Sequence, residues 1–174
     1  MGGYTLVAKG MDHAHKGYLE HEAIVYDQLQ SLQGRYVPVC CGSVELDLPY
    51  HYDGVELRHI LLLSWAGTSL AQLMVQDESF ASMTPSYDER IRKAYEAIRA
   101  LQVLHHDAEP RNMVYDGKTG QLMIIDFERS EIVPRQALCE LSPNRKRKRP
   151  LDQRSRKEFY WGEMARIAGN SQKA

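Results

Sequence analysis

The chain has 174 residues, of which 43% are hydrophobic, with 22 basic and 23 acidic side chains. This length and composition are ordinary for one globular domain, and they exclude a wholly disordered chain or a fibrous repeat. The longest aliphatic run, Ile60–Leu63, is far shorter than the roughly 20 apolar residues of a membrane helix, and no secretory signal is visible. Three cysteines, Cys40, Cys41 and Cys139, predict buried thiols in a reducing compartment.

Basic residues are concentrated in one segment near the end of the sequence. Residues 144–157 carry a net charge of +7, which leaves −8 for the rest of the chain. This basic segment predicts a nuclear-import signal, a nucleic-acid contact or a solvated connection. Because the remainder is acidic, we expect no general binding of nucleic acid. The expected location is cytoplasmic or nuclear, with Arg145–Arg149 as the import signal, and no membrane partner is expected.

The hydrophobic pattern at the N-terminus predicts a strand followed by a helix. Residues 4–9 alternate between two faces and end in Lys9, which is typical of a short strand. Residues 18–33 place apolar side chains at helical spacing, and Gly34 supplies a helix stop.

Two strands and a short helix are predicted next. The strands cover residues 43–46 and 55–63 and are joined through Pro49 and the Asp53-Gly54 turn. The second strand is apolar to its end, so we expect it to be a buried central strand. A short helix follows at residues 69–74.

The longest predicted helix begins at residues 84–86 and continues to about residue 104, with apolar side chains on one face. A hairpin follows, with strands at 112–115 and 121–125 around an Asp-Gly-Lys-Thr-Gly turn. A last helix is predicted at 153–168. This order of elements predicts an α+β fold rather than a regular alternation of strands and helices.

The chemistry is concentrated on either side of the predicted hairpin. Residues 105–112 contain the pattern H-x-D-x-x-x-x-N, and Asp126 follows fourteen residues after the Asn. Asn112 and Asp126 offer hard oxygen ligands for Mg²⁺, and Asp107 can take a proton from an attacking hydroxyl. His105 is expected to brace the loop from behind. Each pattern alone is weak evidence, and the conjunction carries the interpretation.

Two residues of the N-terminal elements extend this constellation. Lys9, at the end of its strand, can hold nucleotide phosphates as a point charge. Glu22, on the inward edge of the next helix, can orient Lys9 and keep it protonated.

In these motifs the chain resembles the protein-kinase-like fold. It looks closest to fungal kinase-like proteins related to aminoglycoside and choline phosphotransferases, a resemblance carried by the segments 18–38, 67–70, 124–130 and 142–149. The resemblance implies two lobes, a small antiparallel sheet plus a helix at about residues 1–64 and a reduced helical second lobe at about 68–168, followed by a tail at 169–174. It also implies ATP and Mg²⁺ as cofactors. Leu63 and Trp65 would lie at the hinge that meets the adenine ring.

The chain departs from that family pattern at three points. Glu109 stands where protein kinases usually carry a Lys, and Glu128 replaces the Gly that commonly follows the metal-binding Asp and Phe. By the family pattern, the single domain at 1–168 is truncated at both ends and lacks the phosphate-binding glycine loop. An open cleft would bind nucleotide weakly and catalyse slowly, because electrostatic catalysis depends on excluding water.

The expected function is therefore an ATP- and magnesium-dependent phosphotransferase that transfers the γ-phosphate to a hydroxyl of a small molecule or protein. A degenerate nucleotide-binding or interaction module without turnover is the alternative. A nuclear or nucleic-acid-associated protein with a basic tail is a third hypothesis, based on Arg145–Arg149.

Overall fold

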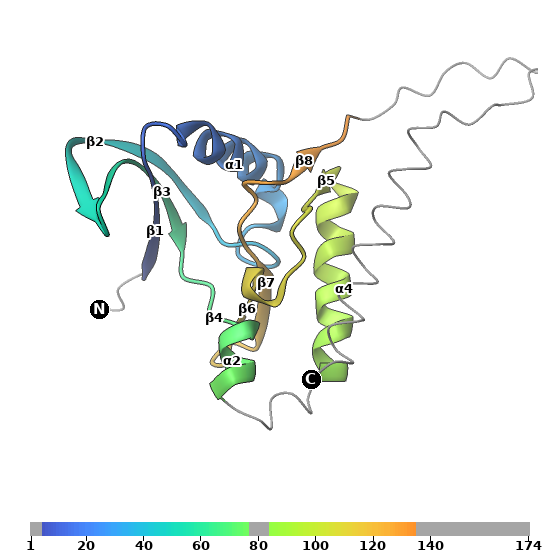
Figure 1. Ribbon diagram of the computed structural model, residues 1–174. Coiled ribbons are helices and arrows are strands. Elements are labelled where there is room, and N and C mark those ends of the chain that lie inside the picture. The colour runs from blue at the N-terminus through green and yellow to red at the C-terminus, as the bar shows by residue number, and fades with distance from the viewer. Residues whose placement is uncertain (1–4, 77–83, 135–174) are drawn as a thin grey trace, which may run out of the picture.

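The computed structural model describes residues 5–76 and 84–134, which form a mixed α+β fold with small antiparallel sheets (Figure 1). The elements are β1 (Leu6–Met11), α1 (Lys16–Gln28), a 3-10 turn (Gln30–Leu32), β2 (Cys40–Tyr52), β3 (Val55–Ser64), β4 (Thr68–Ser69), α2 (Leu70–Gln76), α4 (Thr84–Ala100), β5 (Val103–Leu104), a second 3-10 turn (Pro110–Asn112), β6 (Met113–Asp116), β7 (Gln121–Ile124) and β8 (Glu131–Ile132). The predicted α+β class is confirmed. The basic segment, the helix predicted at 153–168 and the tail lie outside the described residues.

The first sheet has the strand order β1-β3-β2, and α1 packs beside it. The expectation of a buried central strand is confirmed, since β3 lies between its neighbours and alternate side chains along it are buried: His59, Leu61 and Leu63. In this register Lys9 of β1 lies opposite Leu61. The sheet therefore places Lys9 beside the buried centre of the molecule.

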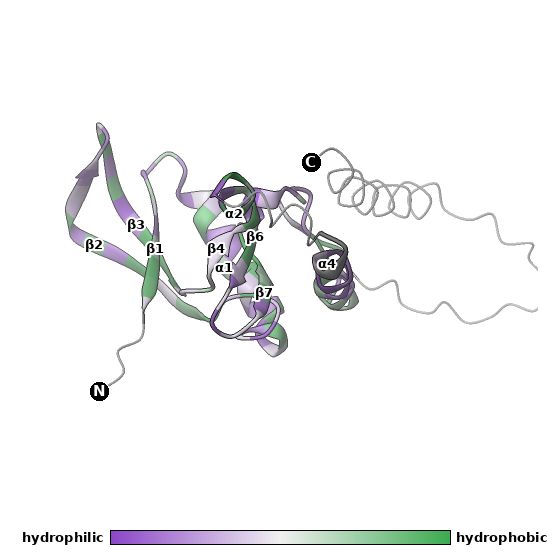
Figure 2. Ribbon diagram, turned by 90° about the horizontal axis from the view of Figure 1, so that it is seen from below, coloured by the Kyte–Doolittle hydropathy of each residue, from purple (hydrophilic) through white to green (hydrophobic). Residues whose placement is uncertain are grey.

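Strand β2 differs from the prediction because it continues through Pro49 to Tyr52. Its pairing with β3 is irregular between Glu45 and Tyr50, and β2 is an edge strand in the described sheet. Pro lacks a backbone N–H, and an irregular edge strand is where that loss is tolerated. The resulting long hairpin extends away from the other elements (Figure 2).

Helix α1 buries one face against the sheet and the loop that follows β7. Leu19, Val25 and Tyr26 are buried on this face, and Glu22 lies among them. The helix ends at Gln28, earlier than predicted, and a 3-10 turn completes the segment up to Leu32. A buried carboxylate in this position requires a partner, and that partner lies in the site described below.

The second part of the fold contains α2, α4 and a sheet of order β4-β6-β7. The predicted hairpin of β6 and β7 is confirmed, and α4 packs its apolar side against this part: Ile91, Ala94, Tyr95 and Ile98 are buried. Helix α4 ends at Ala100 rather than near residue 104. Gln102 has a φ of +67°, which stops the helix and starts β5, the partner of β8.

The described cysteines do not follow the prediction of buried thiols, since Cys40 is partly buried and Cys41 is exposed. Both belong to edge strand β2, and Cys139 lies outside the described residues. Among the helices of residues 5–76 and 84–134, none combines the length and hydrophobicity of a membrane span.

Candidate functional site

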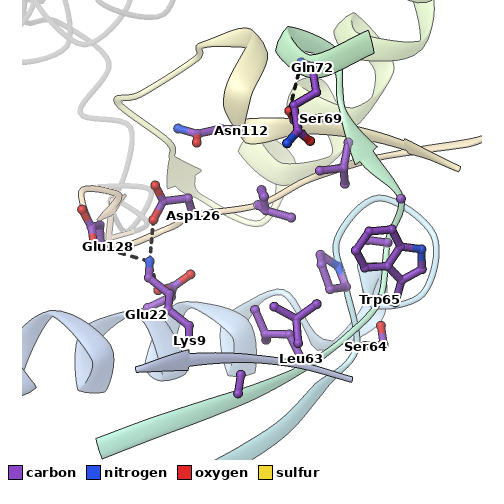
Figure 3. Close-up of a pocket in the computed structure, with 17 residues that line it drawn as sticks. Lys9, Glu22, Leu63, Ser64, Trp65, Ser69, Gln72, Asn112, Asp126 and Glu128 are labelled. Carbon is purple, nitrogen blue, oxygen red and sulfur yellow. Dashed lines mark hydrogen bonds and ion pairs between the residues drawn. The ribbon is translucent and has the colours of Figure 1, made fainter. Parts of the chain in front are cut away.

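A cavity of about 490 Å³ lies between the first sheet with α1 and the part that contains α2 and β6 (Figure 3). This volume is within the range of small-molecule and cofactor sites. Six of the seven predicted site residues line it: Lys9, Glu22, Leu63, Trp65, Asn112 and Asp126. The seventh, Asp107, is outside the cavity lining and is bonded to Asn112.

Lys9 is the centre of a carboxylate cluster at one end of the cavity. Its Nζ lies 2.7 Å from Glu22 Oε2, 2.5 Å from Asp126 Oδ1 and 3.4 Å from Glu128 Oε2. Burial would lower the pKa of Lys9, but the carboxylates of Glu22 and Asp126 outweigh burial and raise it. Lys9 is therefore protonated. With three carboxylates around one ammonium, the ionised cluster carries a net negative charge.

Glu22 ties three segments of the chain together from a fully buried position. Its Oε2 accepts the hydrogen bond from Lys9, and its Oε1 accepts one from the Phe127 backbone N–H at 3.2 Å. Burial raises the pKa of Glu22, and Lys9 acts in the opposite direction. Next to it, His21 donates from Nε2 to the Ser130 carbonyl at 2.8 Å. Helix α1 therefore positions both β1 and the loop after β7.

The loop after β7 presents Asp126 in an unusual backbone conformation. Asp126 has a φ of +69°, in the left-handed region that residues other than glycine rarely adopt. The Phe127 ring that follows is fully buried and meets Tyr26 edge-on at 5.4 Å. Such strain costs about 1–3 kcal/mol, persists only where surrounding contacts impose it and is often found at functional sites.

Asp107 lies in a second loop, where its carboxylate is held by two donors. Arg111 Nη2 donates to Oδ1 at 3.0 Å and to Oδ2 at 2.9 Å, and Asn112 Nδ2 donates to Oδ2 at 3.1 Å. Burial would raise the pKa of Asp107, but Arg111 and Asn112 outweigh it and lower the pKa. Asp107 is therefore ionised, and its lone pairs exceed the donors around it.

His105 braces this loop from behind, as predicted. The side chain is 1% exposed, donates from Nε2 to the Ile125 carbonyl at 2.9 Å and accepts the Asp107 backbone N–H at Nδ1. Its ring meets Phe127 edge-on at 4.8 Å. Burial lowers the pKa of His105, so the imidazole is neutral and links the two loops.

The other end of the cavity is largely apolar and lies where the chain leaves β3. Leu63 is buried and Trp65 is half exposed. The Trp65 backbone N–H donates to the Thr5 carbonyl at 2.9 Å. The predicted contact with adenine at this position therefore depends on the indole ring rather than on that N–H.

Gly67 and Ser69 shape the same end of the cavity. Gly67 has a φ of +117°, and a Cβ atom there would lie 2.3 Å from the carbonyl carbon of Tyr115 in β6. Only glycine allows this close approach. Ser69 Oγ accepts the Gln72 backbone N–H, and both side chains line the cavity. Sequence reasoning missed these two polar side chains, although Ser followed by Gln three residues later is a capping-box spacing that indicates a helix start.

Magnesium fits the oxygen donors that the cavity offers. The Asn112 amide nitrogen donates to Asp107, which leaves the amide oxygen for another partner, and Asn112 and Asp126 both line the cavity (Figure 3). Within residues 5–76 and 84–134, no three His, Cys, Asp or Glu side chains converge as a complete metal site. Mg²⁺ commonly takes one or two protein oxygens and completes its shell with phosphate and water.

Comparison with known proteins shows a similarity to a meiotic driver and assigns no family. No protein-family model matches the chain. Over 150 residues, which cover 83% of this chain, the sequence is 38% identical to the meiotic driver SPOK2 of Podospora anserina. The chain spans 18% of the length of that relative.

This comparison corrects the family expected from the sequence. The assignment to fungal kinase-like proteins related to aminoglycoside and choline phosphotransferases is wrong, because no such family model matches and the similar protein is named as a meiotic driver. The assignment depended on a few short motifs. An amide, two acids and a lysine suit a particular chemistry and can recur in unrelated families.

Proposed function

We propose that the cavity binds ATP with Mg²⁺ and that the chain is a phosphotransferase acting on a hydroxyl group. The observation that carries this proposal is the contact between Lys9 and Asp126, which are 117 residues apart in the sequence. An ammonium for phosphates and a carboxylate for a divalent cation thus share one end of a cavity. Phosphoryl transfer depends mainly on such positioning and on charge neutralisation.

The charge of the cluster explains why a divalent cation is required. Three carboxylates around Lys9 would repel the phosphates of a free nucleotide. A cation held by Asp126 and Asn112 would neutralise phosphate charge and let Lys9 contact the same phosphates. The base would then lie in the apolar end of the cavity, against Leu63 and Trp65.

Asp107 is the proposed proton acceptor of the reaction. It is ionised, it is bonded to the proposed metal ligand Asn112, and it lies beside the cavity rather than inside it. This position suits a group that meets the acceptor hydroxyl at the phosphate end. The two-part, kinase-like arrangement around the nucleotide is the finer fold that this proposal implies, and the reaction class is proposed from these side chains rather than from family membership.

A nucleotide-binding module without turnover is the second candidate. Trp65 is half exposed, so the described residues leave the base end of the cavity open to water.

A binding assay followed by a single-turnover assay separates these candidates. We expect Mg-ATP to raise the melting temperature of the chain, and labelled phosphate to be transferred or released in a reaction that Asp107→Asn and Asp126→Asn abolish. Stabilisation by Mg-ATP without turnover would favour the binding module. If Mg-ATP at millimolar concentration produced no shift, both candidates would be rejected.

A further inference from the structure

An exposed arginine lies beside the proposed proton acceptor. The Arg111 side chain is 61% exposed, whereas that of Asp107 is 15% exposed. The two are joined by hydrogen bonds from a single nitrogen, Nη2, to both carboxylate oxygens. Asp107 thus fixes one corner of the guanidinium, and the rest of the group faces outward.

The Arg111 guanidinium has donors that Asp107 does not use. A guanidinium has five N–H donors in a rigid planar fork that matches carboxylate and phosphate oxygens. Within the described part of the chain, the hydrogen bonds of Arg111 run from Nη2 to Asp107, which leaves Nη1 and Nε without a protein acceptor. An anion bound to either of these nitrogens would lie within a few bonds of a hydroxyl on Asp107.

Arg111 is a cation that lies between two carboxylates, those of Asp107 and Glu109. Glu109 lies close enough to contribute, after Asp107, to the raised pKa of Arg111. An exposed ion pair adds little to the stability of a fold, so stability alone does not account for a guanidinium fixed beside Asp107. The carboxylate of Glu109 would repel a bound anion. A substitution at Glu109 should therefore change anion binding in the opposite direction to a substitution at Arg111.

We infer that the phosphate acceptor is an anionic hydroxyl compound whose carboxylate or phosphate group binds Arg111 at a nitrogen that Asp107 does not engage, Nη1 or Nε, while its hydroxyl lies on Asp107. This inference rests on the proposed phosphotransferase function. In the reaction, the acceptor oxygen bonds to the γ-phosphorus of ATP as the bond from that phosphorus to the bridging oxygen breaks. ADP leaves with the electron pair, and the hydroxyl proton passes to Asp107.

Two sources of this chemistry are distinguished by matched pairs of probes. Glycerol 3-phosphate against glycerol represents a small acceptor, and a seryl peptide flanked by aspartates against one flanked by alanines represents a protein acceptor. The Arg111 Nε–H resonance, identified by its absence in Arg111→Lys, is followed by NMR in the full chain. Each titration is done with and without Mg²⁺ and a non-hydrolysable ATP analogue.

We expect the resonance to move, with saturation, for the anionic member of one pair and to stay in place for both neutral members. Arg111→Gln should weaken that binding by about tenfold, the effect of losing one charge-assisted hydrogen bond. Glu109→Gln should strengthen it. An unmoved resonance, or equal responses within both pairs, would overturn the inference. Binding of inorganic phosphate as tight as that of glycerol 3-phosphate would also count against it, because the hydroxyl would then have no role.

The same samples keep the inference separate from the proposed function. Nucleotide binding is measured independently by calorimetry. Absence of nucleotide binding would reject the proposed function, whereas anion binding at Arg111 would still be decided by the NMR titrations. If acceptors are phosphorylated, the ratio of kcat/KM for the anionic to the neutral member is compared between the native chain and Arg111→Gln. A purely structural role of Arg111 would change both rates equally and leave the ratio constant, which would contradict the inference.

Discussion

The cluster around Lys9 and the pair of Asp107 with Arg111 solve opposite electrostatic problems. The cluster around Lys9 includes the fully buried Glu22 and has more carboxylates than cations. The pair is partly exposed, and its two charges cancel. The first region therefore keeps an uncompensated negative charge, whereas in the second region two opposite charges orient each other at little electrostatic cost.

This difference predicts which region the fold depends on. A buried carboxylate without its cation is strongly destabilising, but an exposed pair can be broken with little effect. Substitutions that remove one partner from each region therefore test the comparison directly.

The largest effect is expected from Lys9→Met, which leaves Glu22 buried without its cation. Loss of one partner of a buried pair costs roughly 3–5 kcal/mol, and we expect a decrease of about that size in the free energy of unfolding measured with urea. The double variant Lys9→Met with Glu22→Gln should recover part of the loss. The matched change in the exposed pair, Arg111→Met, should have a much smaller effect on the free energy of unfolding. Equal losses for Lys9→Met and Arg111→Met would break the comparison.

A smaller effect is expected at Gly67, where the segment after β3 crosses β6. Gly67→Ala places a Cβ atom against the Tyr115 backbone at a φ of +117°, so we expect a loss of about 2–3 kcal/mol in urea unfolding. Gly117→Ala is the control, because a Cβ there meets nothing within 4 Å. Equal stability of the two variants would contradict the close contact between Gly67 and the Tyr115 backbone.

The smallest expected effect is a pH dependence from His105. Because burial lowers its pKa in the folded state, the unfolded chain binds the proton more readily. The stability that His105 contributes is present above its unfolded pKa of about 6.5 and is lost as the pH falls below that value. We expect the native chain to lose about 1 kcal/mol more than His105→Gln between pH 7.5 and pH 5.0. Parallel pH profiles for the two proteins would show that His105 is not buried as a neutral ring.

Much of the fold and of the candidate site could be predicted, because local patterns and global structure agree there. The alternation around Lys9, the helical spacing that turns Glu22 inward and the apolar strand before Asp126 each had one plausible structure. The expectation that these three side chains meet at one site came from the order of these elements along the chain. That the side chains bind nucleotide remains a prediction.

The features that sequence reasoning missed depend on tertiary contacts. Strand β2 passes through Pro49 because it is an irregular edge strand, and α4 ends early because Gln102 adopts a left-handed conformation. The backbone N–H of Trp65 is engaged by Thr5, which no local pattern shows. The family assignment failed for a different reason. Short motifs indicate the chemistry that a site can support more reliably than they indicate common ancestry.

The most direct test of the account is calorimetric titration of the chain with a non-hydrolysable ATP analogue, with and without Mg²⁺. Because the cluster around Lys9 is negatively charged, the analogue should bind at least about tenfold more tightly with Mg²⁺, and Asp126→Asn should abolish that difference. Binding that is as tight without Mg²⁺ as with it, or an unchanged magnesium effect in Asp126→Asn, would contradict the proposal that Asp126 holds the cation.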